Sequence, residues 1–157
     1  MLLAVGLLGL LVVALSFLPW MTISWYPGVN VSGTDMRRFT DAGDGWVTAI
    51  AGAAAALVAI VALLLELRSQ IVASAIAACG LLIACVSGYD LINGWYGTPP
   101  SVLGGGFTFE IHREPALWAT PAAGIVIATA GFALLAAANR RPYADDPNER
   151  SGTEAWA

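Results

Sequence analysis

His112 is the only histidine of the chain, and it lies two residues after Glu110 and two before Glu114. Imidazole and carboxylate groups bind metals, but a zinc site takes three or four such ligands from the protein. The chain has no second histidine, and its cysteines lie in a distant hydrophobic run. The sequence therefore predicts no metal site, and ion pairing at an exposed strand end is the simpler interpretation of His112.

Cys79 and Cys85 are the two cysteines. Six residues apart on a helix, they would point about 240° apart around the helix axis. Neither belongs to a CxxC pair, so a thiol redox site is not predicted. The two long polar segments at 21–45 and 91–116 contain no cysteine, so an extracellular disulfide is excluded. We expect two small side chains facing lipid or another helix.

Charged residues also gather in the segment that contains Asp35, Arg37, Arg38, Asp41 and Asp44. These residues could bind a lipid headgroup, whose phosphate suits arginine, or a periplasmic partner, whereas a mixed run of charges is more often a solvated loop. The run of glycines at 104–106 does not lead into a phosphate-binding motif. The sequence thus offers no catalytic residue and no cofactor site, and an enzyme is not expected.

The composition indicates a membrane protein. Of 157 residues, 58% are hydrophobic and 11% are charged, against roughly 25% charged residues in soluble domains. Mean hydropathy is +0.73. The net charge is −4, lysine is absent and the seven arginines form no basic patch, so nucleic acid is excluded as a partner.

Each of four uncharged runs is close to the ~20 residues that a helix needs to cross a bilayer. Their first charged neighbours are Glu66 after the second run and Asp90 after the third. The first run lacks the basic start and the cleavage motif of a signal peptide. We expect a four-helix transmembrane domain over residues 1–138, with spans at 2–18, 46–65, 71–89 and 117–138, followed by a disordered cytoplasmic tail at 139–157.

Loop lengths set the expected orientation in the cell membrane. The connections 21–45 and 91–116 are long, which suits the exterior, whereas the second connection is the short ELRSQ. Both termini are then cytoplasmic, and Arg68, Arg140 and Arg141 lie inside. The aromatic residues expected at the exterior interface are Trp20, Trp25, Tyr26, Trp46, Tyr89, Trp95, Tyr96 and Trp118.

The exterior loops contain strand-like alternation of apolar and polar residues. Residues 21–26 alternate, Pro27-Gly28 supplies a turn, and residues 29–32 alternate again, which predicts a hairpin. Residues 107–112 form a third candidate strand that could complete a small antiparallel sheet. This β cap would lie over the mouth of the bundle, with an apolar face made by Ile23, Trp25, Phe107 and Phe109.

Small residues predict where the helices touch. Pairs four residues apart let helix backbones approach closely in a membrane, although an alanine-rich helix also produces such pairs by chance. The residues concerned are Gly52, Ala56, Gly80, Ala84, Gly124, Ala128 and Gly131.

Three residues suggest how the helices begin. Asp44 precedes the second span and could be its N-cap. Pro115 suits the first turn of the fourth helix, and Pro121 marks either a kink or a later start of that helix.

LPW ends the first span, VNVSGTD follows in the first exterior loop, GDGW opens the second span, and FTFEI leads into the fourth. With these motifs the chain resembles small four-helix membrane proteins of actinobacteria and other bacteria, which have a claudin-like layout. The resemblance covers residues 1–138. It implies an all-α bundle of four transmembrane helices with an extracytoplasmic antiparallel β cap, and a scaffolding or accessory role. The GLW motif and paired loop cysteines of claudins are missing, which argues against a barrier function.

We therefore expect a non-catalytic accessory or scaffold subunit of a larger cell-envelope membrane complex, with membrane lipids and other membrane subunits as partners. The alternative is a protein that binds a lipid or small molecule, or assists its transport, in apolar space beneath the cap. A proton-coupled exporter would need a carboxylate within the membrane, and the span centres have none. Residues expected to contact a partner or lipid are Trp20, Trp25, Tyr26, Arg37, Arg38, Trp95, Phe107 and Phe109.

Overall fold

The computed structural model describes residues 1–24, 29–35, 43–67, 69–93 and 110–139. They form four helices and three strands in the order helix, two strands, two helices, strand, helix. The helices are α1 (Leu2–Phe17), α2 (Asp44–Leu64), α3 (Gln70–Asn93) and α4 (Pro115–Asn139). The strands are β1 (Pro19–Ser24), β2 (Val29–Ser32) and β3 (Glu110–Arg113), and a 3₁₀ turn, η1 (Gly33–Asp35), follows β2.

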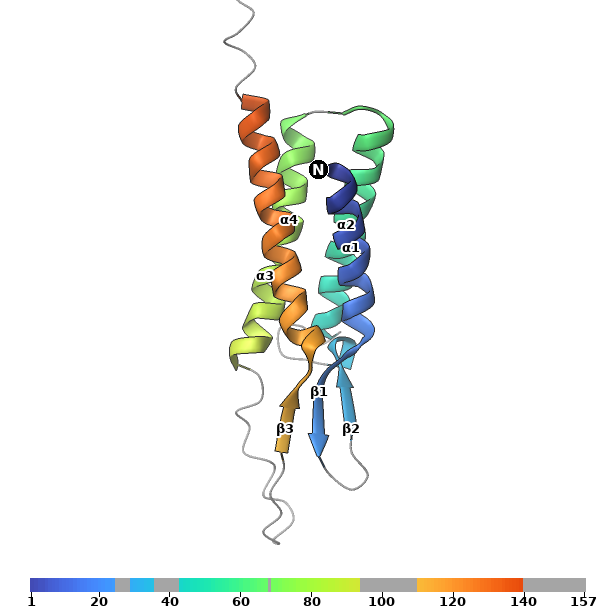
Figure 1. Ribbon diagram of the computed structural model, residues 1–157, viewed down its shortest axis with the longest axis vertical. Helices are drawn as coiled ribbons and strands as arrows, with labels where there is room; N and C mark the ends of the chain where they lie inside the picture. Colours follow the sequence, from blue (N-terminus) through green and yellow to red (C-terminus); the bar gives the residue numbers. More distant parts are fainter. Residues whose placement is uncertain (25–28, 36–42, 68, 94–109, 140–157) are drawn as a thin grey trace, which may run out of the picture.

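The four helices form a closed bundle. α1 packs most closely on α2 and α3 on α4, while α2 also contacts α3 and α1 contacts α4. The strands lie at the end of the bundle where α1 ends and α4 begins (Figure 1). Side chains from all four helices meet in a central core of Val5, Val12, Ala51, Ala55, Ala59, Ile76, Ile83, Ala123 and Ile127.

Three of the predicted spans are confirmed as helices long and apolar enough to cross a membrane: α2, α3 and α4, with 21, 24 and 25 residues. The first predicted span is a shorter apolar helix, α1, of 16 residues, or about 24 Å of rise. Large apolar side chains such as Leu7, Leu57 and Ile125 point outwards and are about 60% exposed. A bundle that is apolar outside as well as inside matches a lipid environment rather than water.

Glycine and alanine bring the helices of each pair into backbone contact. A methyl group added to Gly9 would lie 2.5 Å from the carbonyl oxygen of Gly52 and 2.9 Å from the nitrogen of Ala56. The α3–α4 contact repeats this pattern along both helices. Gly80 lies against Ala128, Gly124 against Ala84, and Gly131 against Ala77. The structure thus places all seven of the predicted small residues at these two contacts, together with Gly9 and Ala77, which the sequence pattern missed.

The expected sheet is present, with β1 in its centre. β1 pairs antiparallel with β2 and with β3, so the order is β2-β1-β3. β3 belongs to the second long connection, as the alternation predicted. β1 begins at Pro19, two residues earlier than expected, and β3 covers Glu110–Arg113. The predicted turn at Pro27-Gly28 and the strand residues 107–109 lie outside the described residues.

The structure differs from the sequence-based expectations at the starts of two helices, α2 and α4. The N-cap of α2 is Gly43, in the left-handed region at φ 102°, and Asp44 is the first helical residue rather than the cap. An acidic residue there still lies in the favourable field of the helix N-terminus. α4 begins at Pro115, as expected, and continues through Pro121, so Pro121 does not mark a later start.

Candidate functional site

The junction of cap and bundle is the most elaborate feature of the described chain. Trp20 and Met21 of β1 form a buried cluster with Ala116 and Leu117 of α4. The indole Nε1 of Trp20 donates a hydrogen bond to the carbonyl oxygen of Leu15 at 2.9 Å. The partly buried side chains of Leu15, Val31 and Leu91 pack around the cluster. Three helices and two strands therefore meet in one small core.

The burial of Trp20 is a correction. The sequence placed Trp20 at the membrane interface, in contact with lipid or a partner, but its side chain is 0% exposed. The pairing of β1 with β2 shifts register between Pro19 and Met21, and such a bulge interrupts the alternation of side chains along a strand. Trp20 and Met21, although adjacent, are therefore both buried in the junction.

Backbone contacts fix the cap at two further points. The amide of Glu114, which follows β3, donates to the carbonyl oxygen of Trp20 at 2.9 Å. In η1, the backbone of Gly33 lies directly against Gly45 of α2, and neither glycine has room for a methyl group. Because the sheet is attached through α1, α2 and α4, its orientation relative to the bundle is fixed.

The other face of the sheet carries a row of polar side chains. Asn30 and His112 both pair with Thr22 from opposite sides, so their side chains lie on the same face. Asn30 and His112 are exposed. The hydroxyl of Thr22 lies 3.1 Å from Asn30 Oδ1 and 2.7 Å from Glu114 Oε1. Asn30, Thr22 and His112 are called the polar row below.

Two aspartates near the cap are completely buried. Asp44 starts α2 and Asp90 lies in the last turn of α3, and both are 0% exposed. The sequence prediction ended the third span at residue 89 and left Asp90 outside it, whereas α3 continues to Asn93. Ionisable groups buried in membrane helices are costly and usually have a function. The sequence did not predict the burial of either residue, since each stands next to the end of an uncharged run rather than within it.

Buried hydroxyl groups at the same end are satisfied locally. Ser16, Ser87 and Thr120 each donate to the carbonyl oxygen four residues earlier, at 2.6–2.8 Å. Ser16 Oγ also lies 2.8 Å from Thr48 Oγ1, which connects α1 with α2.

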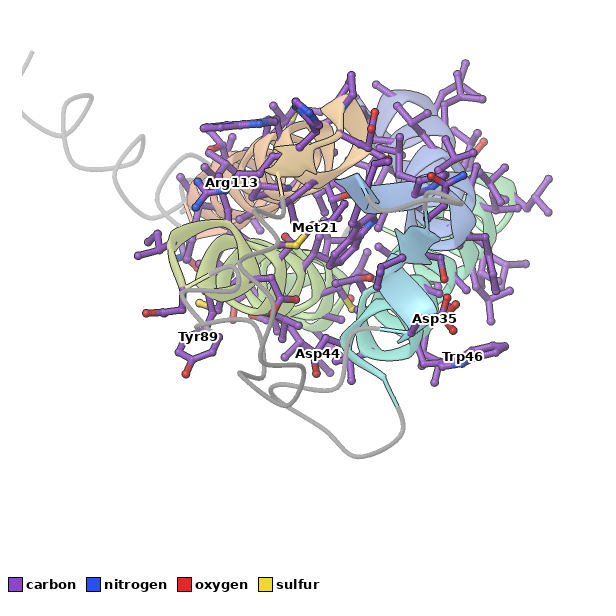
Figure 2. All side chains as sticks on the ribbon, turned by 90° about the horizontal axis from the view of Figure 1, so that it is seen from below. Met21, Asp35, Asp44, Trp46, Tyr89 and Arg113 are labelled. Atoms are coloured by element: carbon purple, nitrogen blue, oxygen red, sulfur yellow. The ribbon has the colours of Figure 1, made fainter. Side chains whose placement is uncertain are left out.

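Exposed aromatic residues surround the cap end of the bundle. Trp46, Tyr89 and Trp118 are 44–54% exposed, and Figure 2 shows Trp46 and Tyr89 pointing outwards while Met21 lies near the centre. Phe17 packs edge-to-face on Trp46, with ring centroids 5.3 Å apart. Such a girdle is typical of a membrane–water interface. Of the described residues of the predicted aromatic belt, Trp46, Tyr89 and Trp118 thus lie at the cap end of the bundle, whereas Trp20 is buried.

Comparison with known proteins gives no match. No family model, no curated protein and no solved structure is similar to the chain.

Of the eight residues expected to contact a partner or lipid, only Trp20 is described. The others, Trp25, Tyr26, Arg37, Arg38, Trp95, Phe107 and Phe109, lie outside the described residues. Within the described ranges, no group of three His, Cys, Asp or Glu side chains could hold a metal ion. Cys79 and Cys85 are free thiols.

Proposed function

We propose that this chain is an integral protein of the cell membrane that crosses the bilayer four times and carries its cap outside the cell. We further propose that it is a non-catalytic accessory or scaffold subunit of a larger membrane complex. The order of the helices and strands supports the claudin-like layout that the sequence resemblance implies.

The fourth crossing is supported by the way α1 lies along α2. Phe17 contacts Trp46 at the cap end, and Gly9 lies against Gly52 in the middle. Towards the other end, a methyl group added to Gly6 would lie 4.0 Å from the Cβ of Ala59. α1 therefore accompanies α2 over nearly its whole length. If α2 spans the bilayer, α1 at its side lies within the same bilayer. The 16 residues of α1 are just below the usual length of a spanning helix.

The observation that carries the scaffold role is the fixed attachment of the sheet. A cluster around Trp20 fills the junction, and Gly33 and Gly45 lock the turn after β2. The polar row therefore keeps a constant position relative to the aromatic girdle. A preorganised surface loses little conformational freedom when it binds, so it suits the recognition of an exterior part of another membrane subunit.

Purification from membranes in mild detergent, with quantification of every co-purifying protein, tests this role. We expect one or a few membrane proteins at a fixed ratio to this chain. Asn30→Arg and His112→Glu should each reduce their recovery, because both change the exposed part of the polar row. Gln70→Arg adds a charge at the opposite end and is the matched control. A solitary monomer, or equal recovery from all variants, would contradict the proposal.

The alternative function, lipid binding beneath the cap, loses support from the same junction. Trp20, Met21 and Leu117 are at most 4% exposed and fill the described space between sheet and helices. Apolar space occurs instead at the other end of the bundle.

A further inference from the structure

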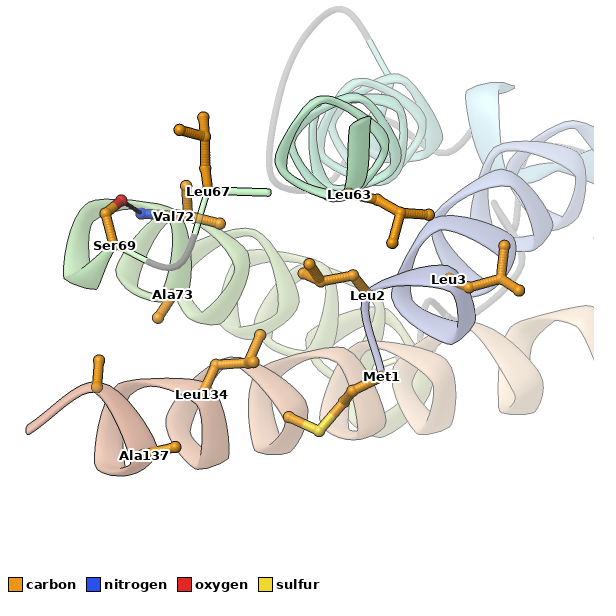
Figure 3. A pocket seen from close by; sticks show the side chains of 11 residues that line it. Met1, Leu2, Leu3, Leu63, Leu67, Ser69, Val72, Ala73, Leu134 and Ala137 are labelled. Atoms are coloured by element: carbon orange, nitrogen blue, oxygen red, sulfur yellow. Dashed lines mark hydrogen bonds between the residues drawn. The ribbon is translucent and has the colours of Figure 1, made fainter. Parts of the chain in front are cut away.

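A cavity of about 410 Å³ opens at the end of the bundle opposite the cap. All four helices contribute to its wall, as Figure 3 shows. Leu2 comes from the start of α1, Leu63 from the end of α2, Val72 from the start of α3 and Leu134 from the last turns of α4. The volume lies within the range of ~300–1,000 Å³ that is usual for ligand pockets.

The cavity is closed at its inner end. Leu2, Val72 and Leu134 line it and also pack on the central core. Below them Val5, Ile76 and Ile127 are at most 1% exposed, and the junction around Trp20 fills the cap end. A ligand could enter from one end and stay, but the described core leaves no route through the bundle.

The side chains that line the cavity are almost all apolar. Among the described residues that line the cavity, Ser69 supplies the one polar side chain, and its Oγ already accepts the amide hydrogen of Val72 at 3.2 Å. A buried water molecule needs two to four polar partners. A hydrocarbon chain brings no group that needs a partner.

We propose that this cavity binds one acyl chain of a membrane phospholipid. The inference rests on the membrane embedding proposed above, because the bilayer then supplies acyl chains next to the opening. An acyl chain that lies against Leu2, Val72 and Leu134 covers apolar surface of the cavity, which would otherwise face the more polar membrane interface. The site is distinct from the cap and from the polar row.

Photolabelling can test the site. The full chain is reconstituted in vesicles of phosphatidylethanolamine and phosphatidylglycerol that contain a phosphatidylglycerol with a diazirine in one acyl chain. Labelled residues are then mapped by mass spectrometry. We expect Leu2, Val72 and Leu134 to be labelled at least threefold more than the outward-facing Leu7 and Leu57. Equal labelling of these five residues would overturn the proposal.

Two variants on α4 provide a matched pair. Leu134→Trp fills part of the cavity and should lower the labelling of Leu2 and Val72 at least threefold, with one fewer phospholipid retained in native mass spectra. Leu135→Trp makes the same change at the adjacent residue, which does not line the cavity, and should leave both readouts unchanged. If Leu134→Trp does not fold, Val72→Phe replaces it. Unchanged labelling in a folded cavity variant would contradict the proposal.

Two further experiments distinguish a wrong ligand from a wrong membrane embedding. A diazirine fatty acid that labels the cavity when the phospholipid does not would overturn the assignment to phospholipid. Release of the protein by alkaline carbonate, with Leu7 and Leu57 unlabelled, would instead overturn the membrane embedding.

Discussion

Ser16 Oγ and Thr48 Oγ1 lie 2.8 Å apart, completely buried, and connect α1 to α2 just inside the cap. Ser16 Oγ also lies 2.8 Å from the carbonyl oxygen of Val12, and Thr48 Oγ1 lies 3.0 Å from the carbonyl oxygen of Gly45. Each hydroxyl has one proton to donate. Two protons therefore serve three short contacts, and the two side chains act as one unit.

Removal of either hydroxyl should weaken this unit. Ser16→Ala or Thr48→Val should lower the free energy of unfolding by about 0.5–1.5 kcal/mol, the range of hydrogen bonds between membrane helices. The double variant should lose less than the sum of the two, because the hydroxyls share their partners. Unfolding in SDS, followed by circular dichroism, measures the effect. Thr129→Val, which removes an exposed hydroxyl bonded to its own helix, is the control, and strict additivity would contradict the coupling.

Two glycines of α3 should respond differently to the same substitution. A methyl group on Gly80 would lie 2.7 Å from the Cα of Ala128, whereas one on Gly88 would meet nothing within 4 Å. Gly80→Ala should therefore destabilise the protein by about 1–3 kcal/mol by separating α3 from α4. Gly88→Ala should be neutral or stabilising by up to ~1 kcal/mol, because alanine favours a helix. Equal effects in the SDS unfolding assay would refute this description of the contact.

The cap should detach when its largest buried side chain is removed. Trp20→Ala deletes the centre of the junction and the hydrogen bond to Leu15, and should cost about 3–5 kcal/mol. The expected readout is faster proteolysis between α1 and α2 in detergent, with little loss of helical signal. Trp118→Ala, at a residue that is 54% exposed, should leave the proteolysis rate unchanged. Equal protease resistance of both variants would contradict the role of Trp20.

Glu66 offers a stabilising substitution. It has φ 52°, and the amide of Leu67 donates to the carbonyl oxygen of Ala62 at 2.9 Å, which is the pattern of a helix end that usually contains glycine at this point. Glu66→Gly relieves the left-handed conformation and should raise the free energy of unfolding by about 0.5–1 kcal/mol. Glu66→Ala keeps the strain and is the control. A destabilised glycine variant would show that the side chain of Glu66 has a favourable role of its own.

Much of the fold could be predicted because each signal is local. Uncharged runs located the helices to within a few residues, since long apolar helices need lipid or a core on every side. Alternation located β2 at residues 29–32 and indicated that a strand near residue 110 would join it. The small residues of α2, α3 and α4 stood at regular spacing, so they also could be identified.

The remaining features depend on residues distant in sequence. The burial of Trp20 follows from a bulge that only the pairing with β2 reveals. Gly9 and Ala77 become contact residues through the helices opposite them. The burial of Asp90 was not predicted because helix α3 extends beyond the hydrophobic run that indicated it. The cavity requires the ends of four helices together, and no single segment indicates it.

The proposed topology has four membrane crossings and places the sheet outside the cell. Cysteine accessibility in intact cells tests this topology, in a background of Cys79→Ala and Cys85→Ala with a tag joined before Met1. An impermeant maleimide should modify Asn30→Cys and His112→Cys in intact cells, but Gln70→Cys only after permeabilisation. An antibody should likewise bind the tag only after permeabilisation. Modification of Gln70→Cys in intact cells, protection of Asn30→Cys, or exposure of the tag outside would contradict the account.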